Sequence, residues 1–299
     1  MSDPIISPFL NDPALARALL AGLMLAVATA PLGAFLILRR MSLIGDAFGH
    51  AILPGAAAAA LLSGGATWAI SLGAALTGTS VFVSASVVGR FLRLPEDAGF
   101  ALFFLSALAL GVIISSHGGE HIHLDELLFG SALTLDKTAL VLCAIAMVTS
   151  VVGMMAIYRP LMIDTLDPKF LANAGRGKNA GPIAQAIFFA LLALASVASF
   201  HALGALMAVG MTIIPAIAAR YFAHSIIGMM MGAGVIAACG VVTGLLTSHH
   251  LDLPTGASII ISLVGFAFIS AFFGPVGSVI SRSGLLVHRP GSKVATSKT

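Results

Sequence analysis

Charged side chains are scarce in this chain: Asp, Glu, Lys and Arg make up 9% of its 299 residues, against 59% for hydrophobic residues. The mean hydropathy is correspondingly high, at +1.06. This composition excludes a soluble domain of the same length, which would need far more polar surface. Apolar stretches of about 17–25 residues, long enough to cross a hydrocarbon core of about 30 Å, recur from Ala14 to Phe273. The sequence therefore predicts an all-α polytopic membrane protein.

Catalytic signatures are absent as well. The chain contains no His-Glu-x-x-His, no Gly-x-Ser-x-Gly and no Gly-x-x-x-x-Gly-Lys-Ser/Thr motif, and no polar stretch is long enough for a soluble catalytic domain. We therefore expect a protein that is not an enzyme, that holds no permanently bound cofactor and that cannot hydrolyse ATP itself.

Cysteine is almost missing too. Cys143 and Cys239 are the only two cysteines, and each lies inside an apolar stretch. The two cysteines could form a disulfide, but we favour the interpretation that each is a small buried hydrophobic side chain.

The apolar stretches predict nine membrane-spanning helices in one transmembrane domain that covers 1–299, with a short tail at 274–299. Residues 124–137 are too broken to span a membrane and predict a short interfacial or re-entrant helix. The first residues lack the basic region of a cleavable signal, so we expect the first helix to be retained. The predicted spans are roughly 15–38, 43–62, 67–89, 98–116, 138–157, 181–199, 203–220, 226–247 and 254–273.

The basic residues orient these nine helices. All but two of the 15 Lys and Arg residues fall on one side of the predicted topology, and only Arg17 and Lys137 fall on the other. Because cytoplasmic loops are enriched in Lys and Arg, the first side is cytoplasmic, the N-terminus is outside and the C-terminus is inside. The net charge of +3 thus reports topology and indicates no nucleic-acid partner. The cytoplasmic set is Arg39, Arg40, Arg90, Arg93, Arg159, Lys169, Arg176, Lys178, Arg220, Arg282, Arg289, Lys293 and Lys298.

Two ionisable residues lie four apart inside the second predicted span. Asp46 and His50 occupy one face of a helix at this spacing, which brings a carboxylate and an imidazole together as a divalent metal requires. An ionisable pair at membrane depth is costly and usually marks a transport path. The alternative is a hydrogen bond that clamps two helices. Small residues such as Gly45, Gly49 and Gly55, and a helix break at Pro54, favour the path.

Six of the nine histidines fall on the outer side of this topology. Together with nearby acidic residues, the two outer loops offer imidazole and carboxylate ligands, as a zinc-handling surface would. The alternative is that these side chains are merely solvated. The candidate metal-collecting residues are His117, Glu120, His121, His123, His249 and His250, with Asp125, Glu126 and Asp252 nearby.

Three residues in or next to the seventh span are candidates for lining the path. His201 lies at the outer end of its helix, and Met207 and Met211 are four residues apart. Thioethers are soft ligands, but a methionine stripe in a membrane helix is more often core packing, and this is the alternative interpretation.

The longest inner loop runs from Tyr158 to Gly175, within a cytoplasmic segment of about 158–179. Asp167 before Pro168 predicts the capped start of a short helix, and Gly175 its end. If ATP drives transport, a separate nucleotide-binding subunit must dock on this side, and this loop is the natural contact.

Several segments carry a family likeness in the family's order: Phe35–Ala47 with His50, Leu53-Pro54-Gly55, Pro95–Ala98, Leu127–Gly130, Asp167-Pro168 with Gly175, Leu203–Leu206, Ile214–Arg220 and Leu253–Gly256. Over about residues 15–275 the chain resembles the membrane permease subunits of bacterial zinc/manganese-type ABC importers. That family takes Zn²⁺, Mn²⁺ or Fe²⁺ from a periplasmic or lipoprotein metal-binding protein.

The resemblance implies the type II fold of vitamin B12-type importers, two permease copies or paralogues, two ATPase subunits inside and a metal-binding protein outside. Asp46 and His50 match the metal-path positions. The Asp167–Gly175 segment would be the coupling helix, and Glu96 and Asp97 would lie near the ATPase interface. The chain departs from the common pattern at Gly49, where serine usually precedes the histidine.

The sequence thus predicts a metal importer of the bacterial inner membrane. The outer histidines favour zinc as the transported ion, with manganese or ferrous iron as alternatives. A proton-coupled secondary carrier, in which Asp46 and His50 relay protons, and a non-transporting scaffold are the competing classes.

Overall fold

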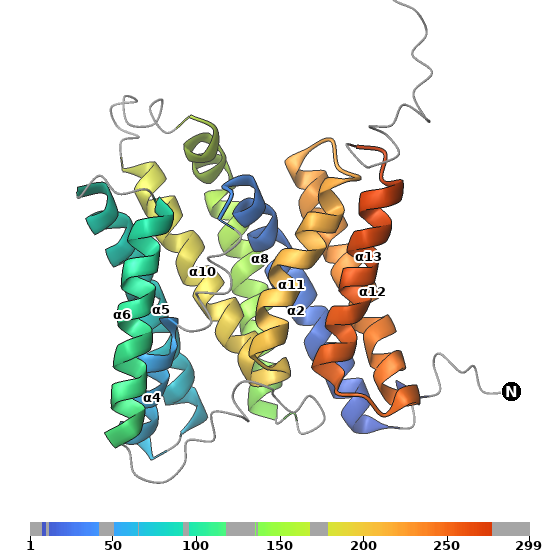
Figure 1. Cartoon of the computed structure of the whole chain (residues 1–299), viewed down its shortest axis with the longest axis horizontal. Coiled ribbons are helices and arrows are strands. Elements are labelled where there is room, and N and C mark those ends of the chain that lie inside the picture. Colours follow the sequence, from blue (N-terminus) through green and yellow to red (C-terminus); the bar gives the residue numbers. More distant parts are fainter. Residues whose placement is uncertain are drawn as a thin grey trace, which may run out of the picture.

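A computed structural model of the chain describes residues 8–9, 12–41, 51–64, 66–91, 96–117, 135, 137–167 and 179–276. These residues form nine helices and no strand (Figure 1). The helices follow the nine predicted spans in order, so the all-α prediction is confirmed for the described part of the chain. They are α2 (Pro13–Leu38), α4 (Leu53–Ser63), α5 (Thr67–Phe91), α6 (Glu96–His117), α8 (Lys137–Leu166), α10 (Ala180–Leu203), α11 (Ala205–Arg220), α12 (Ile226–Leu251) and α13 (Thr255–Phe273).

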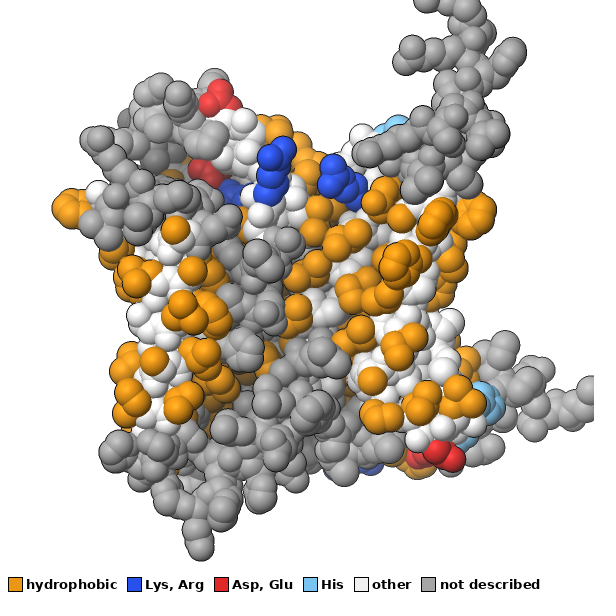
Figure 2. Space-filling view, in the orientation of Figure 1, with side chains coloured by type: hydrophobic (Ala, Val, Ile, Leu, Met, Phe, Trp, Pro, Cys, Tyr) orange, Lys and Arg blue, Asp and Glu red, His pale blue; other side chains and the backbone are white. Residues whose placement is uncertain are grey.

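Six of the helices are long and apolar enough to cross a membrane, and α4, α6 and α11 contain shorter apolar segments. Apolar side chains cover the middle of the bundle on the face shown in Figure 2. Many apolar side chains of the bundle are well exposed, among them Leu62, Trp68 and Met155. Such exposure is typical of a membrane protein, whose outer surface borders lipid or another protein rather than water.

Two helix boundaries differ most from the prediction. Helix α8 continues past Tyr158 and Pro160 to Leu166, so the inner loop begins later than predicted. The extra turns are held by tertiary contacts, since Leu161 is fully buried and Asp164 is bonded to Arg39. Helix α4 covers only the second half of the span predicted at 43–62, with Pro54 in its first turn, and residues 42–50 lie outside the described part.

The connection between α10 and α11 is a single residue, Gly204. Its φ of 89° lies in the region that favours glycine, because a β-carbon would clash with the neighbouring carbonyl. The Gly204 N–H bonds to the carbonyl of Phe200 and the chain reverses at once. This reversal brings α11 back along α2 and α10.

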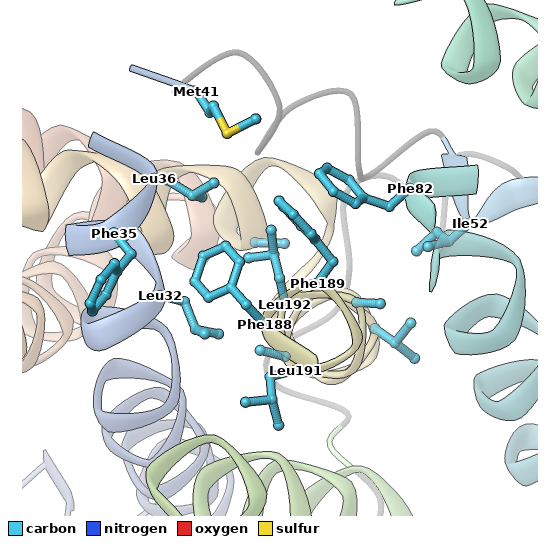
Figure 3. Close-up of a cluster of buried hydrophobic side chains, with 14 of the residues drawn as sticks. Leu32, Phe35, Leu36, Met41, Ile52, Phe82, Phe188, Phe189, Leu191 and Leu192 are labelled. Atoms are coloured by element: carbon cyan, nitrogen blue, oxygen red, sulfur yellow. The ribbon is translucent and has the colours of Figure 1, made fainter. Parts of the chain in front are cut away.

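Helix α10 joins two groups of helices (Figure 1). Helices α4, α5 and α6 pack on one another, and α10 packs against α5 on one side and against α2, α8 and α11 on the other. Aromatic side chains make this junction, with Phe188 facing Phe35 of α2 and Phe189 stacked on Phe82 of α5 (Figure 3). We call this cluster the α10 junction; its residues drawn in Figure 3 include Leu32, Phe35, Leu36, Met41, Ile52, Phe82, Phe188, Phe189, Leu191 and Leu192.

Basic side chains gather at one end of the bundle. Helices α2, α8 and α11 end together, because Arg39 at the end of α2 bonds to Asp164 of α8 and Arg40 lies beside Arg220 of α11. Most basic side chains visible in Figure 2 lie at this upper end. Helix α12 runs the other way, and its last residues lie at the opposite end, beside the start of α13 (Figure 1).

The two cysteines are both free. Cys143 is buried between α8 and α10, and its thiol lies 3.9 Å from the Ala198 carbonyl. Cys239 is exposed on α12. The prediction of a small buried hydrophobe is therefore confirmed for Cys143 and wrong for Cys239, which faces the outside of the bundle.

Candidate functional site

The predicted metal pair, Asp46 and His50, lies in the segment 42–50, outside the described residues. The residues on both sides of that segment are held in the core. Met41 is buried in the α10 junction, and its N–H donates to the Leu36 carbonyl at 2.9 Å. Ile52 is buried in the same cluster (Figure 3). The chain therefore enters and leaves the predicted metal segment at fixed points in one core.

Ala51, the residue directly after His50, is fully buried. It packs against Val81 of α5 and Ala107 of α6. Helix α6 also passes close to the start of α4, because a β-carbon added at Gly111 would lie 3.1 Å from the Pro54 nitrogen. The first turn of α4 is thus enclosed by the two helices that follow it in sequence.

Helices α4 and α5 approach each other through glycine. A β-carbon added at Gly55 would overlap the Thr77 hydroxyl and the Gly73 carbonyl oxygen, and would lie 2.7 Å from the Gly73 carbonyl carbon. A β-carbon at Gly73 would in turn lie 2.7 Å from that of Ala59. Close backbone approach of this kind is how membrane helices gain packing where no hydrophobic effect acts between them. The missing β-carbon at Gly55 therefore permits the close packing of α4 on α5.

His201 contacts α5 through a serine side chain. Its Nε2 lies 2.8 Å from the hydroxyl of Ser71, and the two residues are 130 positions apart in sequence. Ser71 is buried and His201 is half-buried. This pair links α10 to α5 below the α10 junction, and sequence reasoning did not single out Ser71.

Met207 and Met211 are fully buried between α2, α11, α12 and α13. The same cluster contains Leu15, Val241 and Ile259, all of them apolar and buried. This surrounding agrees with the core-packing interpretation of the methionine stripe.

His249 and His250 lie in the last turn of α12, so the predicted loop at 248–252 is wrong up to Leu251. Both are exposed, and their ring centroids are 5.5 Å apart. Asp252 follows as the left-handed cap of the helix, with a φ of 50°. Among the residues that the structure describes, no three His, Cys, Asp or Glu side chains gather as a metal site would need. The side chain of His117 and residues Glu120, His121 and His123 lie outside that part.

The predicted ATPase-coupling residues are only partly described. Asp167 directly follows α8, and its N–H donates to the Ile163 carbonyl at 2.8 Å. Glu96 and Asp97 begin α6 at the end of the bundle where α8 finishes (Figure 1), and the structure describes their backbone only. Pro168 and Gly175 lie outside the described residues.

An ion pair that sequence reasoning missed lies beside these residues. Arg39, the C-cap residue directly after α2, donates from Nη2 to Asp164 Oδ2 at 2.6 Å and from Nε to the Thr165 hydroxyl at 3.0 Å. The side chains of Arg39 and Asp164 are 8% and 12% exposed. From the sequence, Arg39 indicated orientation and formed part of a family segment, and Asp164 was expected in a loop. The signal available was an acid about two helical turns beyond the end of the predicted apolar span at 138–157.

Comparison with known proteins places the chain. Residues 11–274 match the ABC 3 transport family. The manganese transport system membrane protein MntC of Halalkalibacterium halodurans is 30% identical over 287 residues, covering 94% of this chain and 92% of MntC. The chelated iron transport system membrane protein YfeD of Yersinia pestis is 28% identical over 285 residues, covering 94% and 91%.

A solved structure shares the fold. PsaBC from Streptococcus pneumoniae, in complex with Fab, superimposes with a TM-score of 0.78 at 25% identity, over 95% of this chain and all of the matched chain. The bundle of Figure 1 is therefore an ABC-permease fold, as the motifs from Phe35 to Gly256 predicted. The chain is a multi-pass helical membrane protein that belongs to the ABC 3 transport family.

Proposed function

We propose that this chain is the membrane-spanning subunit of an ATP-binding-cassette importer for a divalent transition metal. The observation that carries the proposal is the pair Asp46 and His50 in a chain that matches the ABC 3 transport family over residues 11–274. The buried residues Met41 and Ile52 on either side of that pair support a path through the protein core.

Manganese is the cargo that we favour. The relatives compared above are named for manganese and for chelated iron. The sequence-based preference for zinc rests on the outer histidines, and the two that are described stand next to each other on a helix. Adjacent helical residues point in different directions, so His249 and His250 are poorly placed to chelate one ion. A carboxylate and an imidazole suit Mn²⁺ or Fe²⁺ as well as Zn²⁺. Zinc stays the second candidate.

The partners follow from the two ends of the bundle. The end where Arg39 bonds to Asp164 would face the cytoplasm of a bacterial inner membrane, and the segment between α8 and α10 would bind the ATP-binding subunits there. The opposite end, with His249 and Asp252, would receive the ion from a periplasmic binding protein. The N-terminus would then lie outside and the C-terminus inside.

A second copy of the permease completes the metal site in this proposal. One Asp46 and one His50 from each copy would supply four ligands at the membrane midplane. An ion without ligands is prohibitively costly in hydrocarbon, whereas a tighter cage would not release it. ATP-driven movement of the ATPase subunits would open the path alternately to the two sides.

The test is uptake of radioactive manganese and zinc, in competition, by proteoliposomes that contain the whole importer. We expect ATP-dependent manganese uptake in the wild type and none in Asp46→Asn or His50→Ala, with the complex still assembled. His224→Ala, an exposed histidine outside the proposed path, is the matched control and should keep uptake.

Each other outcome would contradict one part of the proposed function. Zinc uptake that excess manganese does not suppress would make zinc the cargo. Flux that needs a proton gradient but no ATP would favour the secondary carrier. Wild-type uptake in both variants would remove Asp46 and His50 from the path.

A further inference from the structure

Three helix ends meet at one carboxylate. Asp164 lies near the end of α8. Its Oδ2 accepts a hydrogen bond at 2.6 Å from Nη2 of Arg39, at the end of α2. It also lies against the first turn of α10, because a β-carbon added at Gly181 would be 2.6 Å from its Oδ1. The N-terminal end of a helix carries partial positive charge, which favours a carboxylate there. Asp164 therefore holds α2, α8 and α10 together at the same end of the bundle.

These helix ends lead directly into the two segments on which the proposed function depends. Arg39 precedes Asp46 by seven residues, and Met41 between them is buried. Asp164 precedes Asp167 by three residues, and α10, on which its carboxylate lies, begins right after the predicted coupling segment. The ion pair thus connects the chain on both sides of the coupling segment to the chain that leads to the metal pair.

The geometry of the pair indicates a positioning role. Taking two charges out of water is costly, so a buried ion pair contributes little net stability compared with apolar side chains. What it does provide is direction: the planar guanidinium reaches Asp164 and Thr165 at once, and the Thr165 hydroxyl in turn donates to the Leu161 carbonyl at 2.6 Å. The end of α8 therefore cannot turn or slide without moving Arg39.

The neighbouring arginine provides a contrast. Arg40 is exposed and lines a separate hollow with Ile37, Arg220 and Tyr221. It carries the same charge one residue further along the chain. Loss of Arg40 removes a positive charge from the same end of the bundle without touching Asp164.

We propose that Arg39 is a positioning residue for transport, which through Asp164 transmits movement of the segment between α8 and α10 to the segment that carries Asp46 and His50. This inference rests on the proposed function, because it assigns the link between ATP hydrolysis and the metal path. Without the pair, the ATPase subunits would still turn over, but fewer cycles would open the path.

The experiment measures manganese uptake and phosphate release in the same proteoliposomes, with the complete importer. We expect Arg39→Gln and Asp164→Asn each to raise the ATP hydrolysed per ion by about fivefold or more, the lower range of allosteric coupling between two sites. The double variant should show the same ratio as either single variant, because the two residues act as one unit. Arg40→Gln should keep the wild-type ratio.

Two milder variants keep the test decisive if Arg39→Gln fails to assemble. Arg39→Lys keeps the charge beside Asp164 but loses the second bond, and Thr165→Val removes only that second acceptor. Both should give ratios between the wild type and Arg39→Gln. An unchanged ratio in the assembled variants would mean that the pair is only structural, and additive effects would mean that the residues act separately. Either result overturns the inference, whereas a wild type without ATP-dependent uptake overturns the proposed function itself.

Discussion

Gly55 offers the sharpest test of how the start of α4 is held. Replacing Gly55 with alanine puts a β-carbon 2.7 Å from the Gly73 carbonyl carbon, where ordinary contact begins at 3.4 Å. Helices α4 and α5 must therefore separate by about 0.7 Å or more, and a gap of about 0.5–1 Å already loses a quarter to a half of a van der Waals contact. The obstacle is backbone, which has no other rotamer to adopt.

The expected cost follows from that overlap. Overpacking a tight contact costs about 1–3 kcal/mol, and the gain in helix propensity from glycine to alanine, up to about 1 kcal/mol, offsets part of it. We expect a net loss of about 1–2 kcal/mol, which lowers the melting temperature by about 2–8 °C at about 2–4 °C per kcal/mol. Because Gly55 follows His50 by five residues, metal uptake should fall as well.

The assay is the temperature at which half of the detergent-solubilised protein leaves the monodisperse peak, measured beside manganese uptake. Gly265→Ala in α13 is the matched control, because a β-carbon there meets no atom within 4 Å. That variant should be as stable as the wild type or slightly more so. Equal melting temperatures for Gly55→Ala and Gly265→Ala would refute the reasoning that backbone contact between α4 and α5 holds the site.

Two further predictions concern the core and the lipid-facing surface. Phe189→Ala should lower the melting temperature strongly, because the loss of a buried aromatic ring costs about 3–5 kcal/mol. Phe268→Ala removes an exposed ring and should change the melting temperature little. Similar shifts for both variants would argue against the α10 junction. A water-soluble maleimide should label neither Cys143 nor Cys239 in intact membranes, since one is buried in protein and the other faces hydrocarbon, and both should react after unfolding in detergent. Labelling of Cys239 in the membrane would show that this face of α12 borders water.

The family and the order of the helices were predictable because hydropathy acts along the chain. In hydrocarbon every backbone polar group must be satisfied within its own helix, so a long apolar stretch is by itself a prediction of a helix. The end of α8 could not be predicted from hydropathy. Residues Tyr158–Leu166 are polar enough to be taken for a loop, and tertiary contacts of Leu161 and Asp164 keep them helical.

The candidate site also combines features that the sequence predicts with contacts that only the tertiary structure reveals. From the sequence alone came the prediction of metal chemistry at Asp46 and His50, which rests on residue type and spacing and stays a prediction. The sequence also determined which helix ends carry basic charge. Only the tertiary structure decided which distant residues meet: Arg39 with Asp164 across 125 positions and His201 with Ser71 across 130. Helices that are apolar on every side carry no stripe to mark their packing face, so these contacts depend on how small residues let the helices approach.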